Sequence, residues 1–133
     1  LFQLLAAHRV DYHLFLRRLG ELTTQGEWPA SLLALLPDPA ACQEWLETYR
    51  ARLVREGSQD AARKVRMDAI NPKYVLRNAL AQQVIDAAKT GNMAPFERLF
   101  AALQRPYDEQ PEYEDLATPV PQWYCGGELS CSS

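Results

Sequence analysis

The fold of this chain is decided by the stretch NPKYVLRNALAQQVIDAAKTG, which covers residues 71–91. Asn71 suits the N-cap of a helix, Pro72 has the backbone angle of a first helical turn, and Gly91 suits a C-terminal stop. Apolar residues between these signals recur at helical spacing and cover more than half of the circumference. The stretch therefore predicts a long, largely buried helix. Arg77 lies within its apolar arc, so we expect the Arg77 guanidinium to have a partner.

Four other helices are predicted on either side of this long helix. Amphipathic spacing places them at residues 2–22, 39–56, 58–70 and 94–104. Asp38 and Pro39 repeat the signal of a cap followed by a proline, and Gly57 ends that helix. No run of alternating apolar and polar residues predicts a strand. The sequence therefore predicts an all-α fold of about five helices in a compact helical domain.

The sequence changes character after residue 104. Four prolines exclude a long helix there, while several aromatic residues make the segment too apolar for a solvated linker. We therefore divide the chain into a helical domain, residues 1–104, and an extended, proline-rich, acidic tail, residues 105–133. Because the chain begins at Leu1 without a Met, we expect it to be a piece of a longer protein.

Charge is distributed unevenly along the chain. Residues 50–77 carry eight basic and three acidic residues, whereas residues 106–117 carry five acidic residues and no basic one. We expect the acidic segment to pack across the basic helices and one of its carboxylates to pair with Arg77, since a buried charge that loses its partner costs about 3–5 kcal/mol. A phosphate or nucleic-acid contact is the other interpretation of the basic cluster. The basic cluster lacks the interleaved aromatic residues and the preceding glycine-rich loop that are typical of such contacts, which argues against this second interpretation.

The overall composition narrows the class of protein. A net charge of −3 and a pI near 5.4 argue against binding nucleic acid through bulk charge. No apolar stretch reaches the roughly 18 residues that a membrane-spanning helix needs, and no signal-peptide pattern is present. Three cysteines do not make a disulfide framework, so we expect a reducing compartment and a soluble, intracellular protein.

The sequence shows no catalytic constellation. His8 and His13 lie five residues apart, roughly 140° from one another around one helix, and we expect His8 to be a half-buried core residue. No nucleophile elbow, Walker loop or dinucleotide fingerprint is present. The spacing of Cys125 and Cys131 does not match a zinc ribbon. We therefore expect neither a catalytic residue nor a metal site in this chain.

The cysteines differ in their expected environments. Cys42 shares a helical face with apolar residues and is expected to be a small buried hydrophobic residue. Cys131 lies two residues from the last residue of the sequence, in a polar segment. An exposed thiol can ionise and react, so chemistry alone leaves two interpretations of Cys131: a redox residue or an inert cysteine.

Four short segments make the sequence recognisable by their order. They are NPKYVLRNALAQQ at residues 71–83, PYDEQP at 106–111, YED at 113–115 and CSS at 131–133. Residues 11–19 and 45–53 are weaker matches. This combination closely resembles the carboxyl-terminal part of the selenoprotein O family, and the resemblance covers essentially the whole chain.

The resemblance implies a helical carboxyl-terminal domain of a bacterial, cytoplasmic protein adenylyltransferase with a kinase-like fold. Such an enzyme transfers AMP from ATP to Ser, Thr or Tyr hydroxyls of proteins, with Mg²⁺ or Mn²⁺. The nucleotide-binding and catalytic residues belong to the larger amino-terminal part, so the fragment is expected to be inactive alone. The implied partners are that missing kinase-like domain and the protein substrates of the parent, with no nucleic acid and no membrane.

The resemblance also bears on Cys131. It matches the position that selenocysteine or cysteine occupies in the family, where pairing with a cysteine near the activation segment of the catalytic domain implies redox regulation. Cys125 is not part of the family pattern and offers a second partner for Cys131. Two other interpretations of the chain stay open: a free-standing helical interaction module and a thiol oxidoreductase.

Overall fold

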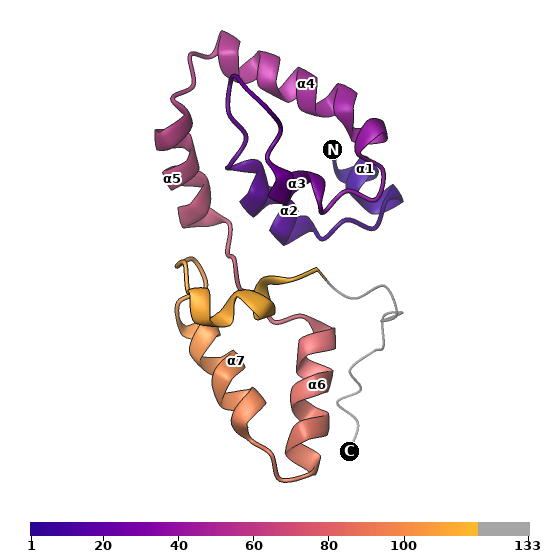
Figure 1. Ribbon diagram of the computed structural model, residues 1–133, viewed down its shortest axis with the longest axis vertical. Helices are drawn as coiled ribbons and strands as arrows, with labels where there is room; N and C mark the ends of the chain where they lie inside the picture. Colours follow the sequence, from indigo (N-terminus) through magenta and orange to yellow (C-terminus); the bar gives the residue numbers. More distant parts are fainter. Residues whose placement is uncertain (120–133) are drawn as a thin grey trace. The chain divides into compact units, whose positions relative to one another are not determined.

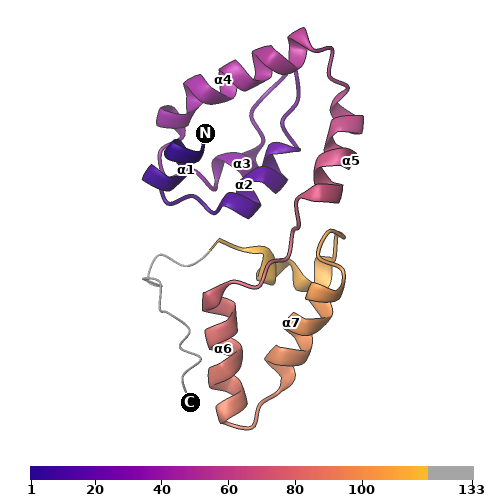
Figure 2. The ribbon, with the colours of Figure 1, turned by 180° about the vertical axis from the view of Figure 1, so that it is seen from behind.

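The structure, a computed structural model, describes residues 1–119 and is all-α over that range (Figures 1 and 2). It contains α1 (Phe2–Ala7), α2 (Tyr12–Leu19), α3 (Ala30–Leu33), α4 (Pro39–Arg55), α5 (Asp60–Ile70), α6 (Asn78–Lys89), α7 (Ala94–Gln104) and the 3-10 helix η1 (Pro111–Ala117). The all-α prediction is confirmed. The described residues form more helices than predicted because the first expected helix is divided and two short helical segments are added.

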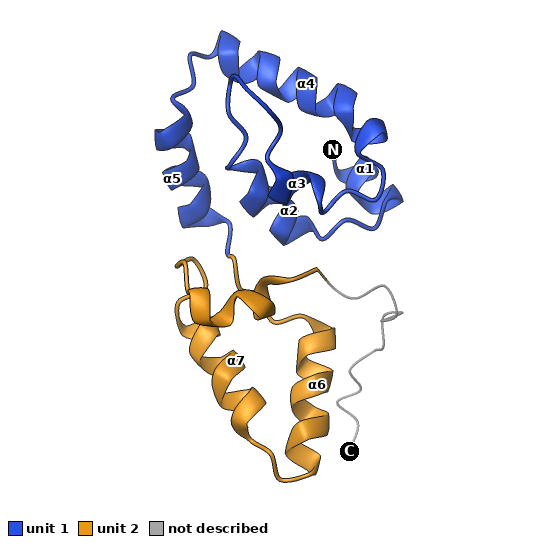
Figure 3. Ribbon diagram, in the orientation of Figure 1, with its two compact units in different colours: residues 1–72 blue, residues 73–133 orange. Residues whose placement is uncertain are grey.

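The chain consists of two compact units, Leu1–Pro72 and Lys73–Ser133, of which the second is described to Pro119 (Figure 3). We call them unit 1 and unit 2. Each has its own cluster of buried apolar side chains. The predicted boundary between residues 104 and 105 is a different division of the chain, and it stays a prediction.

The core of unit 1 collects apolar side chains from its four N-terminal helices and their connections. Its buried members are Leu5, Val10, Phe15, Leu19, Leu22, Leu32, Leu36, Cys42, Leu46 and Leu53. The Asp38 side chain caps α4 by accepting from the Ala41 backbone N–H at 3.2 Å, and Gly57 follows the helix at a φ of 63°. Cys42 is buried as predicted, and burial followed by the charge of Asp38 raises the pKa of its thiol.

The predicted single helix over residues 2–22 is wrong, because the chain breaks between α1 and α2. Arg9 adopts a left-handed backbone with φ 51°, and the Asp11 side chain accepts from the Leu14 N–H at 3.0 Å. An aspartate that bonds the backbone in this way starts a new helix instead of continuing the old one. His8 is half-buried at the C-terminal end of α1, as expected.

Arg17 ties α2 to the C-terminal end of α5 within unit 1. Its side chain is 3% exposed. Nη1 donates to the Asp68 carbonyl at 2.8 Å and to the Asn71 carbonyl at 3.1 Å, while Nε lies 3.4 Å from the Asp68 carboxylate. The last carbonyls of a helix have no partners within the helix, so the guanidinium satisfies groups that would otherwise be buried without hydrogen bonds.

The predicted start of the long helix is also wrong. Asn71 is the C-cap of α5, where its backbone N–H and its side-chain amide both donate to the Met67 carbonyl at 2.9 Å. The chain then runs without helix until Asn78, where α6 begins. Asn71 therefore closes one helix instead of opening the next, and the proline after it follows a helix end.

Unit 2 is built around the short segment that precedes α6. The backbone N–H groups of Lys73 and Tyr74 donate to the Pro106 carbonyl at 2.8 and 3.1 Å. The Tyr74 hydroxyl donates to the Gln110 carbonyl at 2.7 Å, and Tyr74 is buried with Ala102 and Ala117. These contacts hold the chain before α6 against the chain after α7.

The acidic segment beyond residue 104 contributes to this core instead of lying extended on a surface. Residues 111–117 form η1, in which Ala117 is buried. The Gln110 side chain is fully buried, and its amide donates to the Ala102 carbonyl at 3.0 Å and to the Arg105 carbonyl at 2.8 Å. Gln110 thus satisfies carbonyls at the C-terminal end of α7, a requirement that helical periodicity does not reveal.

Candidate functional sites

Arg77 is buried, as the sequence predicts, but it lies outside the helix. It is the N-cap residue of α6, with an extended backbone of φ −92° and ψ 146°, so its predicted place within an apolar helical arc is wrong. The residue is 8% exposed, and Nη1 lies 3.5 Å from the Val75 carbonyl. A cavity of about 170 Å³ is lined by Arg77, Gln83 and Asp115, among others. Ion pairing of Arg77 with an acidic side chain stays a prediction.

Lys73 is a buried cation of unit 2 that the sequence pattern does not predict. It is 3% exposed, and its ammonium group forms ion pairs with Glu109 and Glu114 of the acidic segment. Burial by itself lowers the pKa of Lys73, but the hydrogen bonds that its ammonium donates to the two carboxylates outweigh burial and leave that pKa raised. Matching charges predicted that the acidic segment packs across the basic helices. The structure shows a contact between the acidic segment and Lys73, which lies before α6 and not in a helix.

Another ion pair, between Arg98 and Asp115, joins the acidic segment to α7. The Arg98 guanidinium donates two hydrogen bonds of 2.6 Å to the Asp115 carboxylate and one of 2.7 Å to the Glu112 carbonyl. The hydrogen bond from Arg98 holds the pKa of Asp115 below its usual value. This fork geometry fixes η1 against α7.

The remaining part of the basic cluster is largely engaged inside unit 1. Arg63 is buried and donates to Asp60 at 2.7 Å, to Ser58 at 3.1 Å and to the Leu22 carbonyl. The hydrogen bond from Arg63 lowers the pKa of Asp60. The Arg50 guanidinium lies over the Trp28 ring, 3.6 Å from its centroid. These arginines therefore follow the predicted pattern of internal pairing instead of forming an open patch for phosphate.

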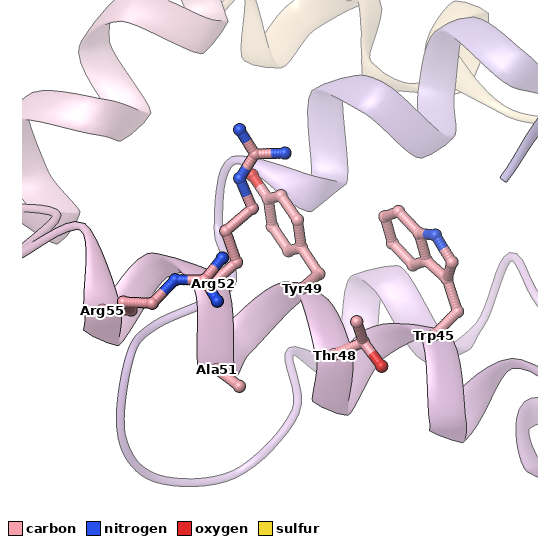
Figure 4. A pocket seen from close by; sticks show the side chains of 6 residues that line it. All are labelled: Trp45, Thr48, Tyr49, Ala51, Arg52 and Arg55. Atoms are coloured by element: carbon pink, nitrogen blue, oxygen red, sulfur yellow. The ribbon is translucent and has the colours of Figure 1, made fainter.

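A hollow on α4 combines aromatic and basic side chains (Figure 4). Its volume is about 420 Å³, and Trp45, Tyr49 and Arg52 project from the same side of the helix. The two rings are stacked, with centroids 5.3 Å apart and an interplanar angle of 9°. Arg52 is held by Glu56 at 2.7 Å. Arg55 also lines the hollow, which therefore combines the two aromatic rings with two basic side chains, of which Arg52 is paired.

An apolar groove of about 300 Å³ lies between α6 and α7 in unit 2. In Figures 1 and 2 these helices diverge from the loop that joins them, and η1 lies near the other end of α7. Residues of α7 on this face are Phe96, Leu99, Phe100 and Leu103. The sequence predicts all four to point inward, but Phe96 and Phe100 are 44% and 54% exposed. Helical spacing identifies the face correctly without showing what covers it.

Three further features of the sequence concern metal binding, membrane spanning and the cysteines near the end of the sequence. Within residues 1–119, no three His, Cys, Asp or Glu side chains are grouped so that they could hold a metal ion. No helix of that described range is long and apolar enough to cross a membrane. Cys125 and the predicted redox residue Cys131 lie outside the described residues.

Comparison with known proteins identifies the family. The family described as "Protein adenylyltransferase SelO" matches residues 1–104. A protein named "Protein nucleotidyltransferase YdiU" from Aeromonas hydrophila is 80% identical over 133 residues, which is all of this chain. Proteins of the same name from Aeromonas salmonicida and Cupriavidus pinatubonensis are 80% and 49% identical, again over the whole chain.

These relatives are much longer than the chain. It spans 28% of the two Aeromonas proteins and 26% of the Cupriavidus protein. The family match nevertheless covers most of the chain and includes every α-helix of the described residues. The chain therefore belongs to the SelO family of protein adenylyltransferases, as the resemblance of its short segments predicted.

Proposed function

We propose that this chain is the helical carboxyl-terminal domain of a bacterial, cytoplasmic protein adenylyltransferase. The parent protein transfers AMP from ATP to Ser, Thr or Tyr hydroxyls of protein substrates, with Mg²⁺ or Mn²⁺, and the kinase-like part that precedes this chain carries the catalytic residues. The main support for the proposal is the family match over residues 1–104. The chain also spans only 28% of the length of its Aeromonas hydrophila relative, which is a much longer protein.

The role of the chain within that parent is structural support. Within residues 1–119, no three acidic, His or Cys side chains are grouped to hold a metal ion. Polar side chains of this range stabilise the fold, as Lys73 and Arg98 do by binding the acidic segment. We assign the steps of AMP transfer to the part of the parent that precedes this chain.

Isotope transfer tests this proposal directly. With ATP labelled at the α-phosphate and Mg²⁺ or Mn²⁺, we expect the full-length parent to transfer label to itself or to an added protein. The 133-residue chain alone is expected to transfer none. Transfer of label by the chain alone would place a catalytic centre within it and contradict the proposal.

We further propose that Cys131 is a regulatory thiol of the parent. The support is the match of Cys131 and the two residues after it to the family position of cysteine or selenocysteine. A thiolate at such a position can react with oxidants and disulfides.

The Cys131→Ser change in the full-length parent is expected to abolish the difference in AMP transfer between oxidised and reduced protein. The Cys125→Ser change is the matched control, and it should retain that difference. AMP transfer is measured after incubation with oxidised or reduced glutathione. Persistence of the redox dependence in the Cys131 variant would show that Cys131 is not the regulatory thiol. Loss of the redox dependence in both variants would identify Cys125 as the disulfide partner of Cys131 in place of a cysteine of the preceding part.

A further inference from the structure

Within residues 73–119, the described part of unit 2, no other element covers the apolar groove between α6 and α7. The side chains that line it are all apolar: Val84 and Ile85 of α6, Phe96, Leu99, Phe100 and Leu103 of α7, with Leu76 and Ala81 beside them. A groove without a lining charge, hydroxyl or amide offers nothing to orient a nucleotide or an ion. Its lining suits another apolar surface.

Large apolar side chains remain exposed around this groove. Ile85 is 42% exposed, Leu76 57% and Phe100 54%. The Phe96 and Phe100 rings are stacked, with centroids 5.9 Å apart and an interplanar angle of 16°, so they present one continuous aromatic surface. Single exposed apolar residues are normal, but a contiguous group on facing helices is typical of an interaction site.

We propose that this groove binds a segment of the full-length parent that lies outside residues 1–133. This inference rests on the proposed function. The chain spans 28% of its Aeromonas relatives, so the greater part of the parent is available to cover the groove. A covalently attached segment has a high effective concentration, which favours it over a second copy of the chain.

The shape of the groove indicates what the segment presents. A trough between two helices accepts a row of apolar side chains spaced at i, i+3 or i+4 and i+7 along an amphipathic helix. Burying the two phenylalanine rings would contribute favourably, because aromatic side chains have large apolar areas. The groove thus selects an amphipathic helix of the parent whose apolar face contacts Phe96 and Phe100.

Thiol labelling of the full-length parent tests this inference. Phe100→Cys places a thiol in the groove, and Tyr107→Cys places one at a residue of unit 2 that is 45% exposed and does not line the groove. Each variant is treated with a maleimide, and the labelling rate at each cysteine is followed by peptide mass spectrometry. We expect the cysteine at position 100 to react more than about tenfold more slowly in the full-length parent than in the 133-residue chain. The cysteine at position 107 should react at similar rates in both.

Three outcomes would overturn the proposal. In the first, the cysteine at position 100 reacts at the same rate in the full-length parent and in the 133-residue chain. In the second, the cysteine at position 107 is slowed in the full-length parent as strongly as the one at position 100. In the third, the slower reaction at position 100 is lost when the full-length parent is diluted. The last would indicate a second copy as the occupant. If Phe100→Cys prevents folding, amide exchange of the α7 peptide in the unchanged proteins provides the test. It should be slower in the full-length parent, and equal exchange would contradict the proposal.

The inference and the proposed function can fail separately. Labelling measures coverage of the groove, whereas AMP transfer measures the activity of the parent. A parent that protects the groove but transfers no AMP would support the docking surface and contradict the proposed function. A parent that transfers AMP while the cysteine at position 100 reacts freely would support the proposed function and contradict the docking surface.

Discussion

Replacing Glu109 and Glu114 together with glutamine is expected to destabilise unit 2 by about 3–5 kcal/mol, because it leaves the buried Lys73 ammonium without its two carboxylate partners. The two glutamate side chains are 60% and 52% exposed, whereas the side chain of Lys73 is 4% exposed. The loss of stability therefore arises mainly from the Lys73 ammonium, because water does not reach it readily in the folded protein.

The same geometry predicts an asymmetry between the two sides of this ion pair. Lys73→Met removes the buried charge and keeps most of the side-chain volume, while the half-exposed carboxylates regain water. We expect this change to cost much less than the double glutamate change.

Amide hydrogen exchange of α6 and α7 peptides measures both effects on unit 2. Glu112→Gln changes an exposed acid of the same segment and is the matched control, expected to shift stability by less than about 0.5 kcal/mol. If the double variant exchanges like the Glu112 variant, Lys73 does not depend on these carboxylates.

The second large effect is expected in unit 1, from Arg17→Leu. This change removes hydrogen bonds to the Asp68 and Asn71 carbonyls and the ion pair with the Asp68 carboxylate. Two carbonyls at a helix end then lose their donor, and the partly buried Asp68 carboxylate keeps only its ion pair with Lys64. Removal of one side of such a buried pair costs about 3–5 kcal/mol.

The neighbouring arginine provides a control for the Arg17 prediction. Arg18 pairs with Glu21 at 2.9 Å, and its side chain is 24% exposed, so we expect Arg18→Leu to cost about 0–1 kcal/mol. Urea unfolding followed by tryptophan fluorescence measures both, because Trp28 and Trp45 contact the unit 1 core. Equal unfolding midpoints for the two variants would show that Arg17 is not needed to hold α2 and α5 together.

Much of the helical framework could be predicted from the sequence where local signals and packing agree. The cap at Asp38 and the apolar face of α4 determine the helix that the structure shows. The bounds predicted for residues 94–104 match α7. In these helices no contact with a distant residue changes where the helix begins or ends, so the periodicity and capping residues of the sequence are sufficient to predict the bounds.

The errors occur where a distant contact overrides a plausible local signal. Asn71 and Pro72 look like a helix start, but the Asn71 carbonyl accepts from Arg17, and the next residues bond to the Pro106 carbonyl. Such competition between local and long-range bonds is invisible in a periodic pattern. The break at Asp11 has a local cause instead: the Asp11 side chain accepts from the Leu14 N–H and starts α2, although the apolar spacing continues across it.

The candidate sites were predicted at a coarser level than the helices. Unequal charge along the sequence indicated that basic and acidic segments meet, but it did not show that Lys73 is the buried partner. The apolar face of α7 was predicted as core, whereas Phe96 and Phe100 remain exposed in the described residues. Pattern identifies an apolar face, and only the arrangement of neighbouring elements shows whether it is covered.

Identification of the transferred group decides whether the full-length parent of this chain transfers AMP to proteins. The full-length parent is incubated with ATP, Mg²⁺ and a protein acceptor, and the acceptor peptides are analysed by mass spectrometry. We expect AMP on a Ser, Thr or Tyr hydroxyl. Transfer of the terminal phosphate instead of AMP, or no transfer by the full-length parent, would contradict the proposed function.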